Sequence, residues 1–317
     1  MGLIASRLAS LFTGLAQSFP KSKLTLRQKR RVWAYLFVAL PFLYFLLVNF
    51  SAMITSFLFS FENYVTISTS REFIGIENYR RVLADPIFGH ALRNTLVFAA
   101  VRVPLITVLS LGVAMMLYNI RRAKGFFRML FFIPFVTSGV AIAWVFKFLY
   151  LPNFGLFTHL FDALDWPRIY FLGDPRTALM SIIAVTVWAS IGYYALIFLA
   201  GLEDIPVEYY EAAMVDGSSA WQRFRQITLP LLNRTMVLVV ILCLISSLQS
   251  FTYVRLMSKD GFGGPLNSTV TMPLLIYKEA FFSLSMGRAS AIAVVFFAMV
   301  LVVTLVQRRL LVREFEY

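Results

Sequence analysis

The chain has 317 residues, of which 59% are hydrophobic and 14% are charged. A soluble domain carries about 25% charged residues, and the mean hydropathy here is +0.76, so the composition excludes an ordinary soluble protein. The net charge of +13 could indicate a nucleic-acid partner. In a chain this apolar, however, Lys and Arg more commonly set the orientation of a membrane protein.

Residues 1–32 are predicted to form a basic cytoplasmic segment that precedes a transmembrane domain over residues 33–317. Apolar residues recur in this segment at helical spacing, namely Ile4, Leu8, Leu11, Leu15 and Phe19. The pattern favours an amphipathic helix on the inner membrane surface, with a loosely ordered tail as the alternative. The apolar block that follows is too long for a cleaved signal peptide, and no small-residue cleavage site follows it.

Six apolar blocks are long enough to cross a bilayer, which needs roughly 20 residues per helix. They lie at 33–59, 94–118, 129–150, 178–202, 232–256 and 289–306, and every Asp and Glu falls outside them. Backbone groups in lipid must be satisfied within the segment, and the blocks lack a two-residue alternation. The sequence therefore predicts an all-α membrane protein with six transmembrane helices.

Basic residues before the first block, between the second and third blocks and after the sixth block predict the orientation. They are Arg7, Lys21, Lys23, Arg27, Lys29, Arg30, Arg31, Arg121, Arg122, Lys124, Arg128, Arg308, Arg309 and Arg313. With six spans these segments share one side, which the positive-inside rule makes cytoplasmic. Both termini and the loop 203–231 are thus expected inside, and the loops 60–93, 151–177 and 257–288 outside.

The first part of the loop 205–230 is predicted to form a short helix. Pro206 suits a first helical turn because it has no N–H to leave unpaired. Glu208 and Glu211 come early in the helix, where its positive end favours carboxylates. Ala212 and Ala213 are small and allow another surface to approach closely.

The second part of this loop is predicted to turn sharply and start another helix. Gly217 suits the left-handed conformation that closes a helix, and Ser218 or Ser219 can cap the next one. Leu229-Pro230 marks the entry to the fifth span. A short helix that projects from a membrane protein into the cytoplasm is typical of a contact site for a partner.

The order Glu211-Ala212-Ala213, three residues ending in Asp216, Gly217, nine residues and Ile227-x-Leu229-Pro230 resembles the EAA loop of binding-protein-dependent ABC import permeases. The resemblance implies a type I importer fold whose coupling helix docks in a groove on an ATP-binding subunit. It assigns ATPase coupling to Glu208, Glu211, Ala212, Ala213, Asp216, Gly217, Ile227, Leu229 and Pro230. The chain is then a transport subunit and not an enzyme.

Two further stretches resemble carbohydrate-type permeases related to the maltose, lactose and glycerol-3-phosphate permeases. They are residues 73–79 with 85–98, and residues 263–269 with Tyr277 and Phe281. The resemblance covers residues 30–312. It implies a bacterial or archaeal inner-membrane location, a second permease subunit, two copies of an ATP-binding subunit that hold ATP and magnesium, and an extracytoplasmic binding protein for a saccharide or related solute.

No cofactor or metal is predicted in this chain. It lacks a phosphate loop of the Gly-x-x-x-x-Gly-Lys-Ser/Thr type, and the single cysteine, Cys243, cannot form an intrachain disulfide. His90 and His159 stand alone, away from any ligand-spaced partner.

The fifth block carries four polar or aromatic residues, Ser246, Gln249, Ser250 and Tyr253, at a spacing that predicts one helix face. Two interpretations remain open: interhelical packing through small polar residues, or a sugar site with a hydroxyl-bonding amide and a stacking ring. Tyr193, Tyr194 and Trp188 in the fourth block are further candidates for aromatic faces on the solute path.

Apart from Arg234 at the start of the fifth block, three cations fall within the blocks, and no acidic residue accompanies them there. Lys147 and Arg255 lie within a turn of a span end and are expected to extend to the interface. Arg102 lies deeper in its span, and three environments are open for it. It is expected to stack on an aromatic ring, to bond helix carbonyls or to line a wet outer vestibule. In the last case an anionic solute, such as a sugar acid or phosphorylated sugar, would bind favourably there. The alternative is that the solute is a neutral oligosaccharide or polyol.

Other classes of function fit less well. A secondary transporter of small polar solutes, the main alternative, would carry ion-coupling acids inside its spans. An intramembrane enzyme would need a buried nucleophile, paired carboxylates or clustered histidines. A receptor or passive channel leaves the helix around Glu211 unexplained.

Overall fold

The computed structural model describes residues 25–67, 71–120 and 122–311. The chain divides into two compact units, residues 1–55 and 56–317, which are described separately. The predicted amphipathic pattern between Ile4 and Phe19 lies outside the described residues. The predicted division of the chain after residue 32 stays a prediction.

The first unit contains one long helix that begins at a capping box. The helix α2 (Leu26–Phe45) starts after Thr25, whose side chain accepts from the Gln28 N–H while the Gln28 side chain accepts from the Thr25 N–H. It continues through a π-helical turn, η1 (Leu46–Phe50), into α3 (Ser51–Phe59). The helix starts earlier than the apolar block predicts because its first turns carry basic residues, which hydropathy does not register as span.

Four helices of the described chain are long and apolar enough to cross a membrane without a break. They are Leu26–Phe59, α5 (Pro86–Asn119), α9 (Ala178–Glu203) and the apolar part of α16 (Met286–Leu311). Two bent helix pairs, Lys124–Val136 with Gly139–Leu149 and Ala220–Leu231 with Asn233–Leu248, raise the number to six if each pair is one span. The prediction of an all-α membrane protein with six spans is confirmed, with corrections to the third and fifth.

The third predicted span is wrong as a single helix. The helices α6 (Lys124–Val136) and α7 (Gly139–Leu149) meet at a bend of 89°. Pro134 lies inside α6 and lacks the N–H that would bond the preceding turn. Thr137 then adopts an extended conformation and Ser138 also leaves the helical region, with ψ 123°, as hydroxyl residues commonly do where they compete with helix hydrogen bonds.

The fifth predicted span is also interrupted. The helix α13 (Asn233–Leu248) ends at Gln249, and α14 (Thr252–Met257) begins three residues later. The residues between them follow neither helix, so the apolar block 232–256 is two helices joined by a short break. Hydropathy does not reveal this break because Phe251 and Tyr253 keep the block apolar.

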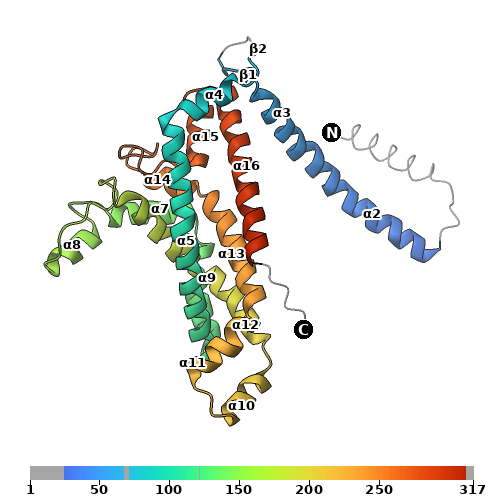
Figure 1. Ribbon diagram of the computed structural model, residues 1–317, viewed down its shortest axis with the longest axis vertical. Helices are drawn as coiled ribbons and strands as arrows, with labels where there is room; N and C mark the ends of the chain where they lie inside the picture. The colour runs from blue at the N-terminus through green and yellow to red at the C-terminus, as the bar shows by residue number, and fades with distance from the viewer. Residues whose placement is uncertain (1–24, 68–70, 121, 312–317) are drawn as a thin grey trace, which may run out of the picture. The chain divides into compact units, whose positions relative to one another are not determined.

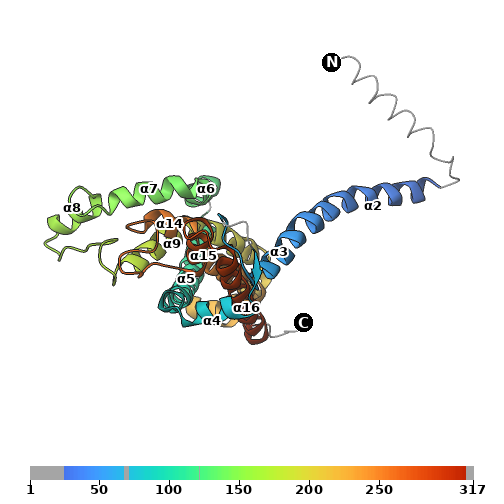
Figure 2. The same ribbon diagram turned by 90° about the horizontal axis from the view of Figure 1, so that it is seen from above.

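Within the second unit, α5, α9, α13 and α16 run lengthwise (Figure 1). The α5–α9 pair carries much of the core, with Phe98 and Ile106 buried against Ile182, Phe198 and Leu199. A second buried cluster joins α4 (Glu77–Ala84), α15 (Met272–Phe281) and α16. Figure 2 shows α6, α7 and α8 (Leu156–Ala163) in a row beside the bundle.

The end of the bundle near α4 and α15 is tied by polar contacts. A short antiparallel pair, β1 (Glu62–Asn63) and β2 (Glu72–Phe73), lies there. The Asn94 amide of α5 donates to the carbonyls of Asn267 and Val270, both at 2.9 Å. These bonds hold the loop before α15 against the start of α5.

An ion pair and an aspartate turn complete this end. Arg288 of α16 pairs with Asp85, the residue that caps α5. Burial acts to raise the pKa of Asp260, but the N–H groups of Phe262 and Gly264, at 2.8 and 2.9 Å from its Oδ1, outweigh burial and hold the pKa below its usual value.

Candidate functional site

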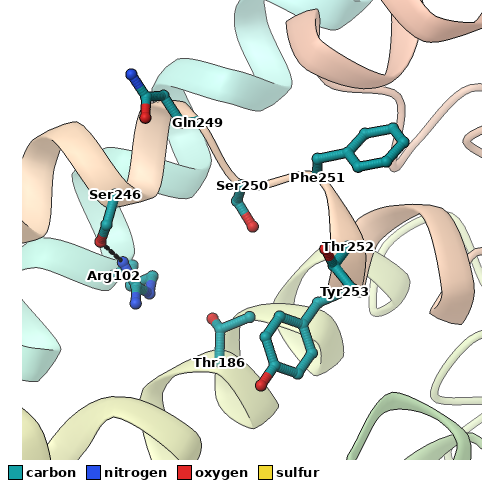
Figure 3. A pocket seen from close by; sticks show the side chains of 8 residues that line it. All are labelled: Arg102, Thr186, Ser246, Gln249, Ser250, Phe251, Thr252 and Tyr253. Carbon is teal, nitrogen blue, oxygen red and sulfur yellow. Dashed lines mark hydrogen bonds between the residues drawn. The ribbon is translucent and has the colours of Figure 1, made fainter. Parts of the chain in front are cut away.

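A cavity of about 220 Å³ lies where the fifth span is interrupted (Figure 3). It is lined by Arg102, Thr186, Ser246, Gln249, Ser250, Phe251, Thr252 and Tyr253. These residues come from α5, α9, the end of α13, the break and the start of α14. The lining combines hydroxyl groups, one amide, two aromatic rings and one cation.

The four residues singled out in the fifth block all line this cavity, but for a different reason than predicted. They do not share one helix face, because α13 ends before Gln249 and α14 begins after it. The break itself brings Ser250 and Tyr253 toward Thr186, while Figure 3 shows the Gln249 amide turned away from Arg102. Their part in solute passage stays a prediction.

Arg102 is 6% exposed and bonds side-chain hydroxyl groups of two other helices. Its Nη1 donates to Ser246 Oγ at 2.8 Å and to Ser247 Oγ at 2.7 Å, and its Nη2 donates to Ser190 Oγ at 2.9 Å. Arg102 thereby joins α5 to α9 and α13. Its predicted partners, an aromatic face or helix carbonyls, are wrong, whereas it does line a cavity.

The serine partners connect the guanidinium to backbone carbonyl groups through hydrogen bonds. Ser190 donates its own proton to the Thr186 carbonyl at 2.7 Å, and Ser246 and Ser247 donate to the Cys243 carbonyl at 3.1 and 2.6 Å. Each hydroxyl therefore accepts from the guanidinium and donates to a helix carbonyl, as a hydroxyl with one donor and two acceptor positions allows.

The three aromatic candidates of α9 lie around this cavity without lining it. The Tyr194 hydroxyl lies 3.1 Å from Ser246 Oγ. The Tyr193 ring stacks on Phe135 at 4.4 Å between ring centroids, and Trp188 packs against Phe146 at 5.1 Å. Tyr194 lies beside a lining residue, whereas Tyr193 and Trp188 each have an aromatic neighbour, and Trp188 is 47% exposed.

The two shallower cations have protein partners that the sequence did not predict. Lys147 donates to the Leu256 carbonyl at 3.0 Å and lies over the Trp144 ring at 5.2 Å. The Arg255 guanidinium lies 4.7 Å from the centroid of Phe262 and donates to the Gly261 carbonyl. The expectation that both extend to the interface stays a prediction.

The loop 205–230 forms two helices and a tight turn at the end of the bundle opposite α4 (Figure 1). The helix α10 (Val207–Val215) begins after Pro206, which caps it and lies outside its first turn. Gly217 has φ +77°, which confirms the predicted left-handed turn. Ser219 caps α11 (Ala220–Arg223) in a capping box with Gln222.

A π-helical turn, η2 (Phe224–Thr228), and α12 (Leu229–Leu231) lead from α11 to α13. The Tyr210 hydroxyl lies 3.0 Å from Thr228 Oγ1, which links α10 to this segment. Arg223 donates to the Ser218 carbonyl at 2.5 Å. Two side-chain bonds therefore fix the geometry of the loop.

The outer face of α10 is open to its surroundings. Among the predicted coupling residues, the exposed ones are Glu208, Glu211, Ala212, Asp216, Gly217 and Pro230, and the partly buried ones are Ala213, Ile227 and Leu229. Apolar side chains accompany them, with Val215 88% exposed and Tyr209 and Met214 about half exposed.

The sequence of the chain matches a known protein family. A family model described as "Binding-protein-dependent transport system inner membrane component" matches residues 109–314. The chain belongs to this family. The matched region contains α10, the turn at Gly217 and the break at residues 249–251.

Individual relatives support the same assignment. The permease is 32% identical to the trehalose/maltose transport system permease protein MalF of Thermococcus litoralis, over 79% of this chain and 84% of that protein. It is 36% identical to the lactose transport system permease protein LacF of Rhizobium radiobacter, over 74% of this chain and 80% of that protein. The predicted resemblance to carbohydrate-type ABC permeases is confirmed.

The fold of the permease also matches a solved structure. A chain from the crystal structure of a bacterial ABC transporter that imports the acidic polysaccharide alginate superimposes with a TM-score of 0.79 at 21% sequence identity. The match covers 91% of this permease and 98% of that chain. This likeness supports the type I importer fold.

Sequence reasoning missed several residues of the cavity region in this permease. Thr186, Phe251 and Thr252 line the cavity, and Ser190 and Ser247 bind Arg102. Thr186 and Ser190 lie four residues apart on α9, a spacing that places them on one face. That spacing was the available signal, although nothing in it points to Arg102.

Proposed function

We propose that this permease forms part of the membrane pathway of an ATP-driven importer for a saccharide or related solute. An extracytoplasmic binding protein delivers the solute, and a second permease subunit completes the pathway. Two copies of a separate ATP-binding subunit, which hold ATP and magnesium, drive transport. This chain contributes no catalytic residue.

The observation that carries the proposal is the exposed helix α10 in a loop that is fixed to the spans. Its outer face combines carboxylates with exposed apolar residues, the mixture that protein interfaces commonly use. The Tyr210–Thr228 bond and the path through α12 connect α10 with α13. Movement of an attached subunit would therefore reach the spans.

The polar lining of the cavity supports a saccharide as the solute class. Ser250, Thr252 and Thr186 offer hydroxyls, Gln249 offers an amide, and Phe251 and Tyr253 offer ring faces. Sugars present hydroxyl groups around an apolar ring face, so such a lining can bind both parts of them.

Charge reversal on α10 tests the docking of the ATP-binding subunit. In Glu211→Arg we expect the amount of ATP-binding subunit that co-purifies with the permease to fall at least about tenfold, since an interface charge reversal commonly costs several kcal/mol. Glu72→Arg, an exposed carboxylate in β2 at the other end of the bundle, is the matched control. Equal recovery in both variants would rule out α10 as the contact.

Thiol labelling tests the proposed orientation, in which both termini and the loop 203–231 are cytoplasmic. Leu266 is 85% exposed and Val215 is 88% exposed. In a Cys243→Ala background, Leu266→Cys is expected to react with an impermeant maleimide added to intact cells, whereas Val215→Cys reacts only after permeabilisation. The reverse pattern would overturn the orientation argued from Lys and Arg.

A further inference from the structure

The charge of the cavity at the break of the fifth span is not neutralised by the protein. Arg102 is the charged residue among those that line it. None of the ion pairs in the described parts of the chain includes Arg102. Its hydroxyl partners are neutral, so the cavity remains positive.

The end of α13 compensates this charge only in part. Ser246 and Ser247, which accept from Arg102, belong to the last turn of α13. A helix C-terminus carries the equivalent of about half a negative charge, which leaves roughly half of the guanidinium charge unbalanced. Such a charge at the cavity attracts an anion.

The guanidinium also retains unused donors. An arginine side chain has five N–H groups, and the three hydroxyl contacts leave Nε without a hydrogen-bond partner although it is buried. The edge formed by Nε and Nη2 is the one with which arginine binds a carboxylate through two hydrogen bonds, and in Arg102 the Nη2 of this edge already donates to Ser190. Arg168 does so in this same chain, from Nε and Nη2 to Asp162 at 2.8 and 2.9 Å.

The remaining lining limits the size and nature of the ligand. The cavity of about 220 Å³ is smaller than the ≈ 300–1,000 Å³ of typical small-molecule sites. It therefore suits one sugar unit better than a whole oligosaccharide. The hydroxyl groups of Ser250 and Thr252 line the same cavity as the cation and offer neutral contacts to a ligand.

We propose that the solute of this permease is an acidic saccharide, whose carboxylate or other oxyanion pairs with Arg102 as one sugar unit occupies the cavity. The proposal rests on the proposed import function and names the charge of its solute. Arg102 then has two roles, since it also holds α5, α9 and α13 together through its serine partners.

Paired ligands that differ only at C6, with a carboxylate in one and a hydroxymethyl group in the other, test this proposal. The complete importer, purified with its co-purifying subunits in lipid nanodiscs, is titrated calorimetrically with glucuronate against glucose and with galacturonate against galactose. We expect the acidic member of at least one pair to bind about tenfold more tightly, because a hydrogen bond to a charged group is stronger than one between neutral groups. Raising the salt concentration is expected to shrink this ratio.

Glucose 6-sulfate and glucose 6-phosphate identify which oxyanion the site prefers. Arg102→Gln is expected to bring the acid-to-neutral ratio close to one. Arg102→Lys keeps the charge and loses the planar fork, so it is expected to retain a reduced preference for the acid. If Arg102→Gln does not assemble, Arg102→Lys provides the test in its place. Lys147→Gln is the matched control, because this cation bonds the Leu256 carbonyl and does not line the cavity.

Three outcomes would overturn the proposal: equal binding of both members of each pair, a preference for the acid that persists in Arg102→Gln, or no binding of any acidic probe. Each would leave Arg102 as a residue that only holds three helices together. The import function itself is judged separately, by co-purification of the ATP-binding subunit with the Glu211 variants, so its failure and the failure of this proposal are distinguishable.

Discussion

Replacement of Gly217 by proline is expected to abolish the response of ATP hydrolysis to solute while the spans still insert. Gly217 has φ +77°, and proline is locked near −65°. The Gly217 N–H also donates to the Met214 carbonyl at 3.1 Å, and proline cannot supply this bond. The turn after α10 would have to open, and α10 would lose its fixed direction.

The measurement is ATPase activity of the reconstituted importer with and without solute-loaded binding protein. Gly217→Asn is the control, because asparagine tolerates the left-handed region, and a Cβ at Gly217 meets nothing within 4 Å. We expect the asparagine variant to retain most of the stimulation and the proline variant less than about a tenth of it. Full stimulation in Gly217→Pro would show that this turn does not transmit movement.

Replacement of Gly192 by alanine is expected to disrupt the packing of α6 on α9. A Cβ at Gly192 would lie 1.9 Å from the Phe131 carbonyl oxygen and 2.5 Å from its carbonyl carbon. These are backbone atoms, so no side chain can swing aside to relieve the clash. Overpacking typically costs about 1–3 kcal/mol, and we expect the upper end or more here because the whole of α6 must shift.

Thermal unfolding of the detergent-solubilised permease measures this effect, with the yield of folded protein as a second readout. The control is Gly112→Ala in α5, where a Cβ meets nothing within 4 Å. Alanine has a higher helix propensity than glycine by up to ~1 kcal/mol, so Gly112→Ala is expected to be neutral or slightly stabilising. Similar unfolding temperatures for the two alanine variants would contradict the close crossing at Gly192.

Hydropathy predicted the number and order of the spans because each span must present a long apolar surface to lipid. It did not predict where helices break, since a break is decided by local backbone chemistry. Pro134, Thr137 and Ser138 interrupt the third span within an apolar context. The break after Leu248 is equally invisible to hydropathy, because the residues around it are as apolar as those of an unbroken span.

The conformation of the loop 205–230 was predictable in detail because its signals are local. A left-handed glycine and a capping serine with a glutamine three residues on are properties of a few neighbouring residues. The cavity was less predictable, because its contacts join distant parts of the chain. Arg102 bonds Ser190, 88 positions away, and Ser246, 144 positions away, and no spacing rule connects such residues.

The position of α13 between the loop and the cavity has a mechanical consequence. Its 16 residues form a rod of about 24 Å at 1.5 Å per residue. One end of this rod follows the segment that Tyr210 holds through Thr228, and the other end carries Ser246 and Ser247, which grip Arg102. The chain bends by 66° where Ala220–Leu231 meets Asn233–Leu248, so a displacement has to move α13 itself along its axis to reach Ser246 and Ser247. Such a displacement would change the distances between these hydroxyl groups and the Arg102 guanidinium of α5.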